Sequence, residues 1–194
     1  PDGRLVVAHA PTLADALHRN DVDDQNRSLA SMLFACAVAS FGTFRIPGGG
    51  TVVAATSEEG RVVTNGMSQY SRNERNANAG IVVGISPADY AQPGHRDDQH
   101  GRAVHPLDGI AFQRRWETRA FELGGGDYYA PGQLLGDFLR RQRSAVLGSV
   151  LPSYTPGVRL TDLAQPGHGS LPVDVLDAIR DAMPAFDRQI KGFA

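Results

Sequence analysis

The sequence predicts an α+β domain, with a small antiparallel sheet over about residues 43–86 packed against helices that follow Pro106. Three observations predict this class. The first stretch consists of short β-branched runs separated by Gly, Pro, Ser and Asn, which is typical of strands joined by turns. Those turns leave no room for the dozen or more residues that a parallel crossover requires. After Pro106, the apolar residues instead recur with a helical period.

Length, charge and cysteine content narrow the possible functions. The 194 residues suit one domain, or one domain with a small appendage. A formal net charge of −2 disfavours non-specific nucleic-acid binding, because it provides no positive field for a polyanion. The only cysteine, Cys36, can form neither an internal disulfide nor a thiolate zinc cluster, which predicts the reducing cytoplasm. The longest apolar run, Leu29–Ala39, falls short of the roughly 20 residues of a membrane span, so no membrane partner is expected.

The first 40 residues differ from the rest in their sequence pattern, which is helical. Thr12 and Ser28 can each cap a helix, so residues 1–40 are expected to form a helical head before a domain at 41–194. The two helices expected in this head are Leu13–Arg19 and Leu29–Ala39.

The β-rich stretch predicts an antiparallel hairpin. The turn Ser57–Gly60 suits a type I turn followed by a left-handed glycine, and it would pair Thr51–Thr56 with Arg61–Thr64. Two further strands are expected at Thr43–Ile46 and Gly80–Ile85.

Three helices are expected after Pro106. The first has apolar residues on two faces, including Trp116 and Phe121, and therefore lies between two layers before it ends at Gly124–Gly126. Pro131 is suited to open the second helix, and Pro184 to stop the third. The predicted spans are about 107–123, 131–143 and 171–183.

The run Gly48, Gly49 and Gly50 lies between two predicted strands. Three glycines let the backbone approach a ligand closely, and such a loop can direct several N–H groups at an anion or a carbonyl. A plain hairpin turn or a bulge is the competing interpretation, and without a following helix or lysine the run is no phosphate loop.

A second candidate segment follows Thr64. Asn65, Met67, Ser68 and Tyr70 bring an amide, a thioether, a hydroxyl and a phenol together, which suits the wall of a polar pocket. The alternative is that Asn65–Gly66 is only a turn. Because both segments adjoin strand ends, we expect Gly49 and Asn65 to meet at one rim of the sheet, where a flavin or substrate would dock.

No metal site or self-contained catalytic apparatus is predicted. His95, His100 and His105 lie in the segment 91–105, whose glycines and charges indicate a solvated loop rather than a set of metal ligands. The chain carries neither a dinucleotide fingerprint nor the motif of a phosphate loop, zinc protease or serine hydrolase, so no catalytic residue is assigned.

Five runs together resemble a known family: SEEG, TNGMS, AFELGGG, PSYTPGV and IKGF. In their order and amino-acid sequence, these runs are similar to the interior of bacterial FAD-dependent, NAD(FAD)-utilising dehydrogenases, over about residues 43–194. The resemblance implies a substrate-side domain that covers the flavin, between the two halves of a flavin-binding domain. It also implies that the dinucleotide fingerprint lies upstream and a second glycine-rich flavin segment downstream, so this chain has no complete dinucleotide-binding domain.

The resemblance makes a FAD-dependent oxidoreductase the first hypothesis. It implies FAD as cofactor and a small-molecule substrate, with Gly48, Gly49 and Gly50 near the flavin or substrate and Asn65, Met67, Ser68 and Tyr70 lining the cavity. The second hypothesis is a non-catalytic binding or oligomerising module, since the two apolar faces of the helix at 107–123 need cover and a homo-oligomer would provide it.

Overall fold

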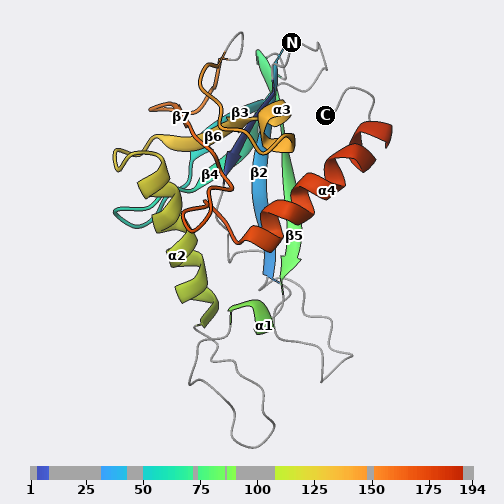
Figure 1. The fold of residues 1–194 in the computed structure, drawn as a ribbon. Coiled ribbons are helices and arrows are strands. Elements are labelled where there is room, and N and C mark those ends of the chain that lie inside the picture. The colour runs from blue at the N-terminus through green and yellow to red at the C-terminus, as the bar shows by residue number, and fades with distance from the viewer. Residues whose placement is uncertain are drawn as a thin grey trace, which may run out of the picture.

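Two sheets and four helices make up the described part of the chain (Figure 1). The computed structural model describes residues 4–8, 32–42, 50–71, 74–85, 87–90, 108–147 and 151–189. This is the α+β class that the sequence predicts. The elements in chain order are β1 (Arg4–Ala8), β2 (Met32–Gly42), β3 (Gly50–Ala54), β4 (Thr64–Ser68), β5 (Asn76–Ile85), α1 (Pro87–Tyr90), α2 (Asp108–Leu123), β6 (Ala130–Leu134), α3 (Leu135–Leu139), β7 (Val158–Leu160) and α4 (Val173–Gln189).

The larger sheet has five strands in the order β5-β2-β1-β6-β7. All neighbours are antiparallel except β6 and β7, which run parallel. The strands β3 and β4 form a separate two-stranded sheet. The strands predicted over 43–86 therefore do not form one continuous meander, because β5 pairs with β2 instead of with the hairpin.

The helix predicted at Leu29–Ala39 is wrong where the structure describes it, because Met32–Gly42 forms β2. This strand is hydrogen-bonded on both edges, to β1 and to β5, and its register shifts between Ala35 and Ala37. A strand in the interior of a sheet reads as a nearly continuous apolar run, and periodicity alone cannot distinguish it from a buried helix. β2 also runs through the domain boundary expected between residues 40 and 41.

The predicted hairpin is present, with a different second strand. β3 pairs antiparallel with β4, and the register sets Ala54 opposite Thr64. Gly60 has the left-handed conformation that the turn requires, with φ of 70°. The expected partner strand starting at Arg61 is wrong because Val62, fully buried, donates its N–H to the carbonyl of Glu117 in α2 at 3.1 Å. The chain thus packs on α2 before it joins the ladder.

The helix predicted over 131–143 is mostly wrong. Residues up to Leu134 belong to β6, and only Leu135–Leu139 is helical. β1 pairs with Gly132 to Leu134 only. Pro131 lies outside that pairing, so its missing N–H removes no hydrogen bond to β1. Strand pairing on both edges overrides the helical pattern of the side chains.

The last predicted helix is present but longer than expected. It runs through Pro184, where the sequence predicts a stop, and continues to Gln189. The residues beyond the proline retain the apolar pattern, since Phe186 packs beside the same core as Ile179 and Met183. That burial offsets the one backbone hydrogen bond that a proline removes.

Two apolar clusters lie on either side of α2, as its two apolar faces predict. Phe112 and Trp116 pack with the first cluster, which joins α2, α3 and α4 to β5. Ala120 and Phe121 pack with the second, which joins α2 to β3 and β6. Figure 1 shows α4 crossing the strands β2 and β5 on one face of the larger sheet.

Several expectations lie outside the described residues: the helix Leu13–Arg19, the strand Thr43–Ile46 and the histidine-containing segment 91–105. Within the residues that are described, no helix combines the length and hydropathy of a membrane span.

Candidate functional site

The predicted glycine loop and polar wall both involve the hairpin of β3 and β4. Gly48 and Gly49 lie outside the described residues, whereas Gly50 begins β3 directly opposite Ser68, the last residue of β4. Asn65 pairs with Val53 near the other end. Gly50 and Ser68 therefore share one end of the hairpin, and Asn65 lies toward the opposite end.

One face of this hairpin carries two residues of the predicted pocket wall, Asn65 and Met67. Asn65 and Gly66 pair with β3, so the alternative that they form a turn is wrong. Asn65 and Met67 lie on the same face because side chains alternate along a strand, and Asn65 Nδ2 donates to Met67 Sδ at 3.8 Å. Met67 is 46% exposed, Val53 is 36% exposed, and Tyr70 beyond the strand is fully exposed. We call Val53, Asn65 and Met67 the hairpin face.

The opposite side of the hairpin explains two glycines structurally. Asn78 of β5 lies under the hairpin, and its Nδ2 donates to the carbonyls of Thr51 at 3.1 Å and of Met67 at 3.3 Å. A Cβ on Gly50 would lie 2.7 Å from the Met67 carbonyl and overlap the Asn78 amide, and one on Gly66 would lie 2.8 Å from Asn78 Oδ1. Both glycines are thus needed for Asn78 to join the hairpin to the larger sheet.

The outer edge of β3 is bound by the segment that follows residue 150. Ser153 Oγ accepts a hydrogen bond from the Val52 N–H at 2.9 Å. The carbonyl of Leu151 accepts bonds from Arg75 and Asn76, both at 2.9 Å. The hairpin is therefore anchored from below and along one edge, while the hairpin face stays uncovered.

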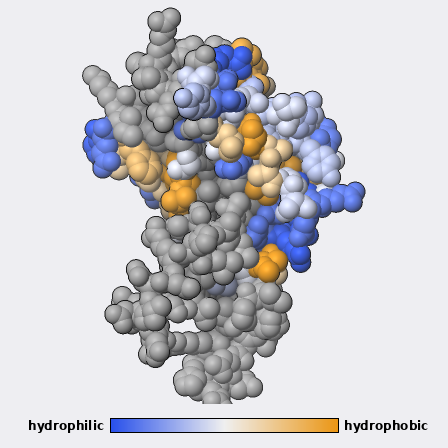
Figure 2. All heavy atoms as spheres, turned by 180° about the vertical axis from the view of Figure 1, so that it is seen from behind, coloured by the Kyte–Doolittle hydropathy of each residue, from blue (hydrophilic) through white to orange (hydrophobic). Residues whose placement is uncertain are grey.

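Uncovered apolar side chains are a general feature of this part of the molecule. Seen from behind (Figure 2), apolar groups reach the surface at several places among hydrophilic ones. β3, β4 and β5 contact one another, and each contributes an exposed apolar residue. These residues are Val53, Met67 and Val82.

A buried carboxyl group lies where the hairpin loop meets α2. Glu117 is 4% exposed and its Oε1 accepts a hydrogen bond from Gln113 Nε2 at 2.7 Å. Burial raises the pKa of the Glu117 carboxyl, although the bond from Gln113 and the charges of Arg61 and Arg114 act in the opposite direction. The charged form of Glu117 is therefore disfavoured in the folded chain.

Replacing Glu117 by glutamine is expected to stabilise the fold progressively as pH rises. A carboxyl whose folded pKa is raised contributes its stability fully below the unfolded pKa and loses it as pH rises through the folded pKa. Glutamine retains the acceptor for Gln113 and has no charge to bury. Urea denaturation of both proteins between about pH 4 and pH 8 measures their free energies of unfolding. The value for the variant is expected to increase relative to that of the parent as pH rises. A difference that is constant with pH would contradict the raised pKa.

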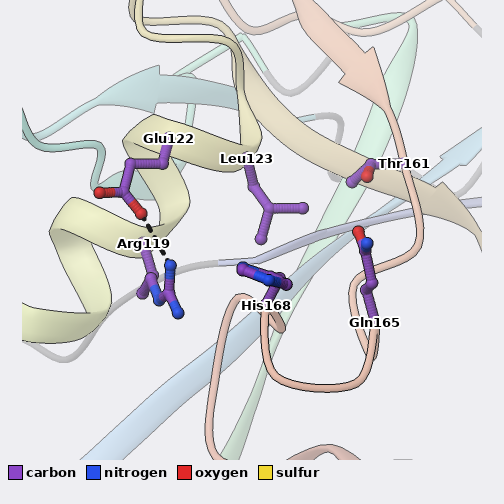
Figure 3. A pocket seen from close by; sticks show the side chains of 6 residues that line it. All are labelled: Arg119, Glu122, Leu123, Thr161, Gln165 and His168. Atoms are coloured by element: carbon purple, nitrogen blue, oxygen red, sulfur yellow. Dashed lines mark hydrogen bonds and ion pairs between the residues drawn. The ribbon is translucent and has the colours of Figure 1, made fainter.

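A pocket that the sequence does not predict lies between α2 and the segment after β7. Its volume is about 400 Å³, and Figure 3 shows its side chains converging from two sides. Arg119 Nη1 pairs with Glu122 Oε2 at 3.0 Å, and Arg119 Nη2 donates to the Gly167 carbonyl at 2.9 Å. The signal in the sequence that could indicate this pocket is the spacing of Arg119 and Glu122, which are three residues apart and therefore neighbours on the surface of α2. The lining residues are Arg119, Glu122, Leu123, Thr161, Gln165 and His168.

Metal ligation finds no support in the part of the chain that the structure describes. There, no three His, Cys, Asp or Glu side chains group closely enough to hold a metal ion.

Comparison with known proteins shows the class to which the chain belongs. Residues 28–194 match the family model described as FAD-dependent protein, C-terminal domain-like, so the chain belongs to this family. An uncharacterised protein of Clostridium beijerinckii is 45% identical over 146 residues. The match covers 75% of this chain and 25% of that protein, so the chain spans about a quarter of the length of its curated relative.

The hairpin face and the two long helices differ in how well they suit the parts of FAD. The diphosphate of a dinucleotide is commonly bound at a helix N-terminus, but α2 and α4 carry Asp108 and Asp174 in their first turns, whose charge opposes a phosphate. The hairpin face, with a valine, a thioether and an amide, suits contact with a flat ring that has polar edges. The hairpin face therefore fits the ring side of the flavin, and the N-termini of α2 and α4 do not fit its diphosphate.

Proposed function

We propose that this chain supplies the substrate-side domain that covers the flavin of a FAD-dependent oxidoreductase. The observation that carries the proposal is the uncovered hairpin face in a chain of a FAD-dependent family. The face is anchored by Asn78 below and by Ser153 at its edge, so it can present its side chains in a defined position. The flavin, when bound, supplies the hydride chemistry.

The role of these side chains is to bind and orient. Val53 and Met67 offer apolar contact, and the Asn65 amide can donate to and accept from a polar group of the ring or substrate. Gly50 acts through the placement of the hairpin, since its lack of a side chain makes room for Asn78. Gly48 and Gly49 remain candidates for backbone contact, and no residue is assigned as a general acid or base.

Protection from oxidation tests the position of the hairpin face. In the full natural protein, hydroxyl-radical labelling is expected to modify Met67 and Tyr70 several-fold less with FAD bound than after its removal, because the flavin and its domain would cover them. Tyr128, 41% exposed, is the internal control and should react equally in both forms. Equal labelling of Met67 in both forms would overturn the proposal and favour a module without a flavin role.

A further inference from the structure

The pocket between α2 and the segment after β7 contains a threonine hydroxyl that is accessible from the pocket. Thr161 lines the pocket, is 8% exposed, and its side-chain hydroxyl makes no hydrogen bond within the described part of the chain. Its backbone is fixed by the bond from Thr161 N–H to the Gly132 carbonyl at 2.9 Å. A hydroxyl can donate one hydrogen bond and accept two, so this one is placed for a bound water or ligand.

Arg119, which also lines the pocket, supplies a cation in a fixed position. The bonds of Arg119 to Glu122 and to the Gly167 carbonyl hold its guanidinium at the pocket. A guanidinium has five N–H donors, so these two bonds leave donors for a ligand. A planar guanidinium matches the two oxygens of a carboxylate. Because Glu122 already offsets the charge of Arg119, a singly charged group suits the site better than a polyanion.

The remaining lining completes a site for a small polar molecule. Gln165 and His168 come from the turn that Arg119 holds against α2, and their side chains can bond hydroxyl or carbonyl oxygens (Figure 3). Leu123 adds one apolar wall. A volume of about 400 Å³ lies at the small end of the range for ligand pockets, roughly 300 to 1,000 Å³.

We infer that this pocket binds a small hydroxy- or oxo-carboxylate, with the carboxylate on Arg119 and the second oxygen group on Thr161. This site is separate from the hairpin face and does not depend on it. Its ligand is a substrate or an effector of the same protein.

Calorimetric titration of the full natural protein with lactate, a singly charged hydroxycarboxylate, tests the inference, with glycerol as the uncharged control. Lactate is expected to bind and glycerol to give no measurable heat. Thr161→Val keeps the shape of the side chain and should weaken lactate binding about fivefold without lowering the melting temperature. Arg119→Gln should weaken it about tenfold or more.

Two matched substitutions outside the pocket complete the design. Thr155→Val and Arg143→Gln alter exposed residues and should leave lactate affinity unchanged. The inference is overturned if lactate does not bind, if glycerol binds as well as lactate, or if Thr161→Val binds lactate like the parent. Labelling of Met67 in the presence and absence of FAD is independent of these outcomes.

Discussion

Replacing Gly124 by alanine is expected to lower the free energy of unfolding by about 3 kcal/mol, since an added Cβ would overlap the backbone carbonyl oxygen of Tyr129. Gly124 closes α2 by donating its N–H to the Ala120 carbonyl at 2.9 Å. The chain then reverses through Gly125 and Gly126, which have φ of 98° and 77°, and returns against the helix end. Backbone atoms cannot move aside as a flexible side chain can, so the overlap must distort the junction of α2 and β6.

Thermal unfolding followed by circular dichroism should show that this substitution lowers the melting temperature by about 6 to 12 °C. Gly80→Ala is the matched control, because a Cβ at Gly80 meets no atom within 4 Å. The control is expected to stay within about 0.5 kcal/mol of the parent. Equal stability of the two variants would show that the helix end does not pack as closely as described.

Replacing Gln133 by leucine is expected to lower the free energy of unfolding by about 2 to 4 kcal/mol, because it leaves the buried N–H of Leu163 and the partly buried carbonyl of Gln142 without their partners. The side chain of Gln133 is fully buried in β6. Its Nε2 donates to the Gln142 carbonyl at 2.6 Å, and its Oε1 accepts from the Leu163 N–H at 3.1 Å. This one amide therefore ties the segments after α3 and after β7 to the strand β6 of the larger sheet.

Urea denaturation measures the effect, with Gln142→Leu as the control for the same change of residue type. Gln142 is exposed and contributes its backbone carbonyl to the bond, which the substitution retains. The control should change the free energy of unfolding by no more than about 0.5 kcal/mol. A similar small change for Gln133→Leu would mean that water replaces both lost bonds.

Features set by neighbouring residues could be predicted from the sequence. The helix α2 matches its predicted span because its apolar residues repeat with a period near 3.6 and a glycine run can adopt the left-handed conformation at its end. Gly60 is left-handed as predicted, for the same local reason. The exposed position of Asn65 and Met67 also follows from alternation along a strand, once the strand is known.

Other features depend on contacts between distant residues. β2 becomes a strand because β1 and β5 complete its hydrogen bonds, and β6 because β1 and β7 do so. Continuation of α4 beyond Pro184 depends on the core that receives Phe186. An apolar run shows that a segment will be buried, but its hydrogen-bond partners decide whether it forms a strand or a helix.

The candidate sites divide in the same way. Sequence identifies the residue types of the hairpin face and the family to which the chain belongs. It does not show that Gly50 is required by Asn78, nor that Thr161 lies across a pocket from Arg119. Those relations join residues 28 and 42 positions apart, and only tertiary packing brings such residues together. The sequence by itself therefore determined the local turns, the helix α2 and the residue types of the candidate sites. Long-range hydrogen bonding and burial decided which segments became strands and which side chains lie together.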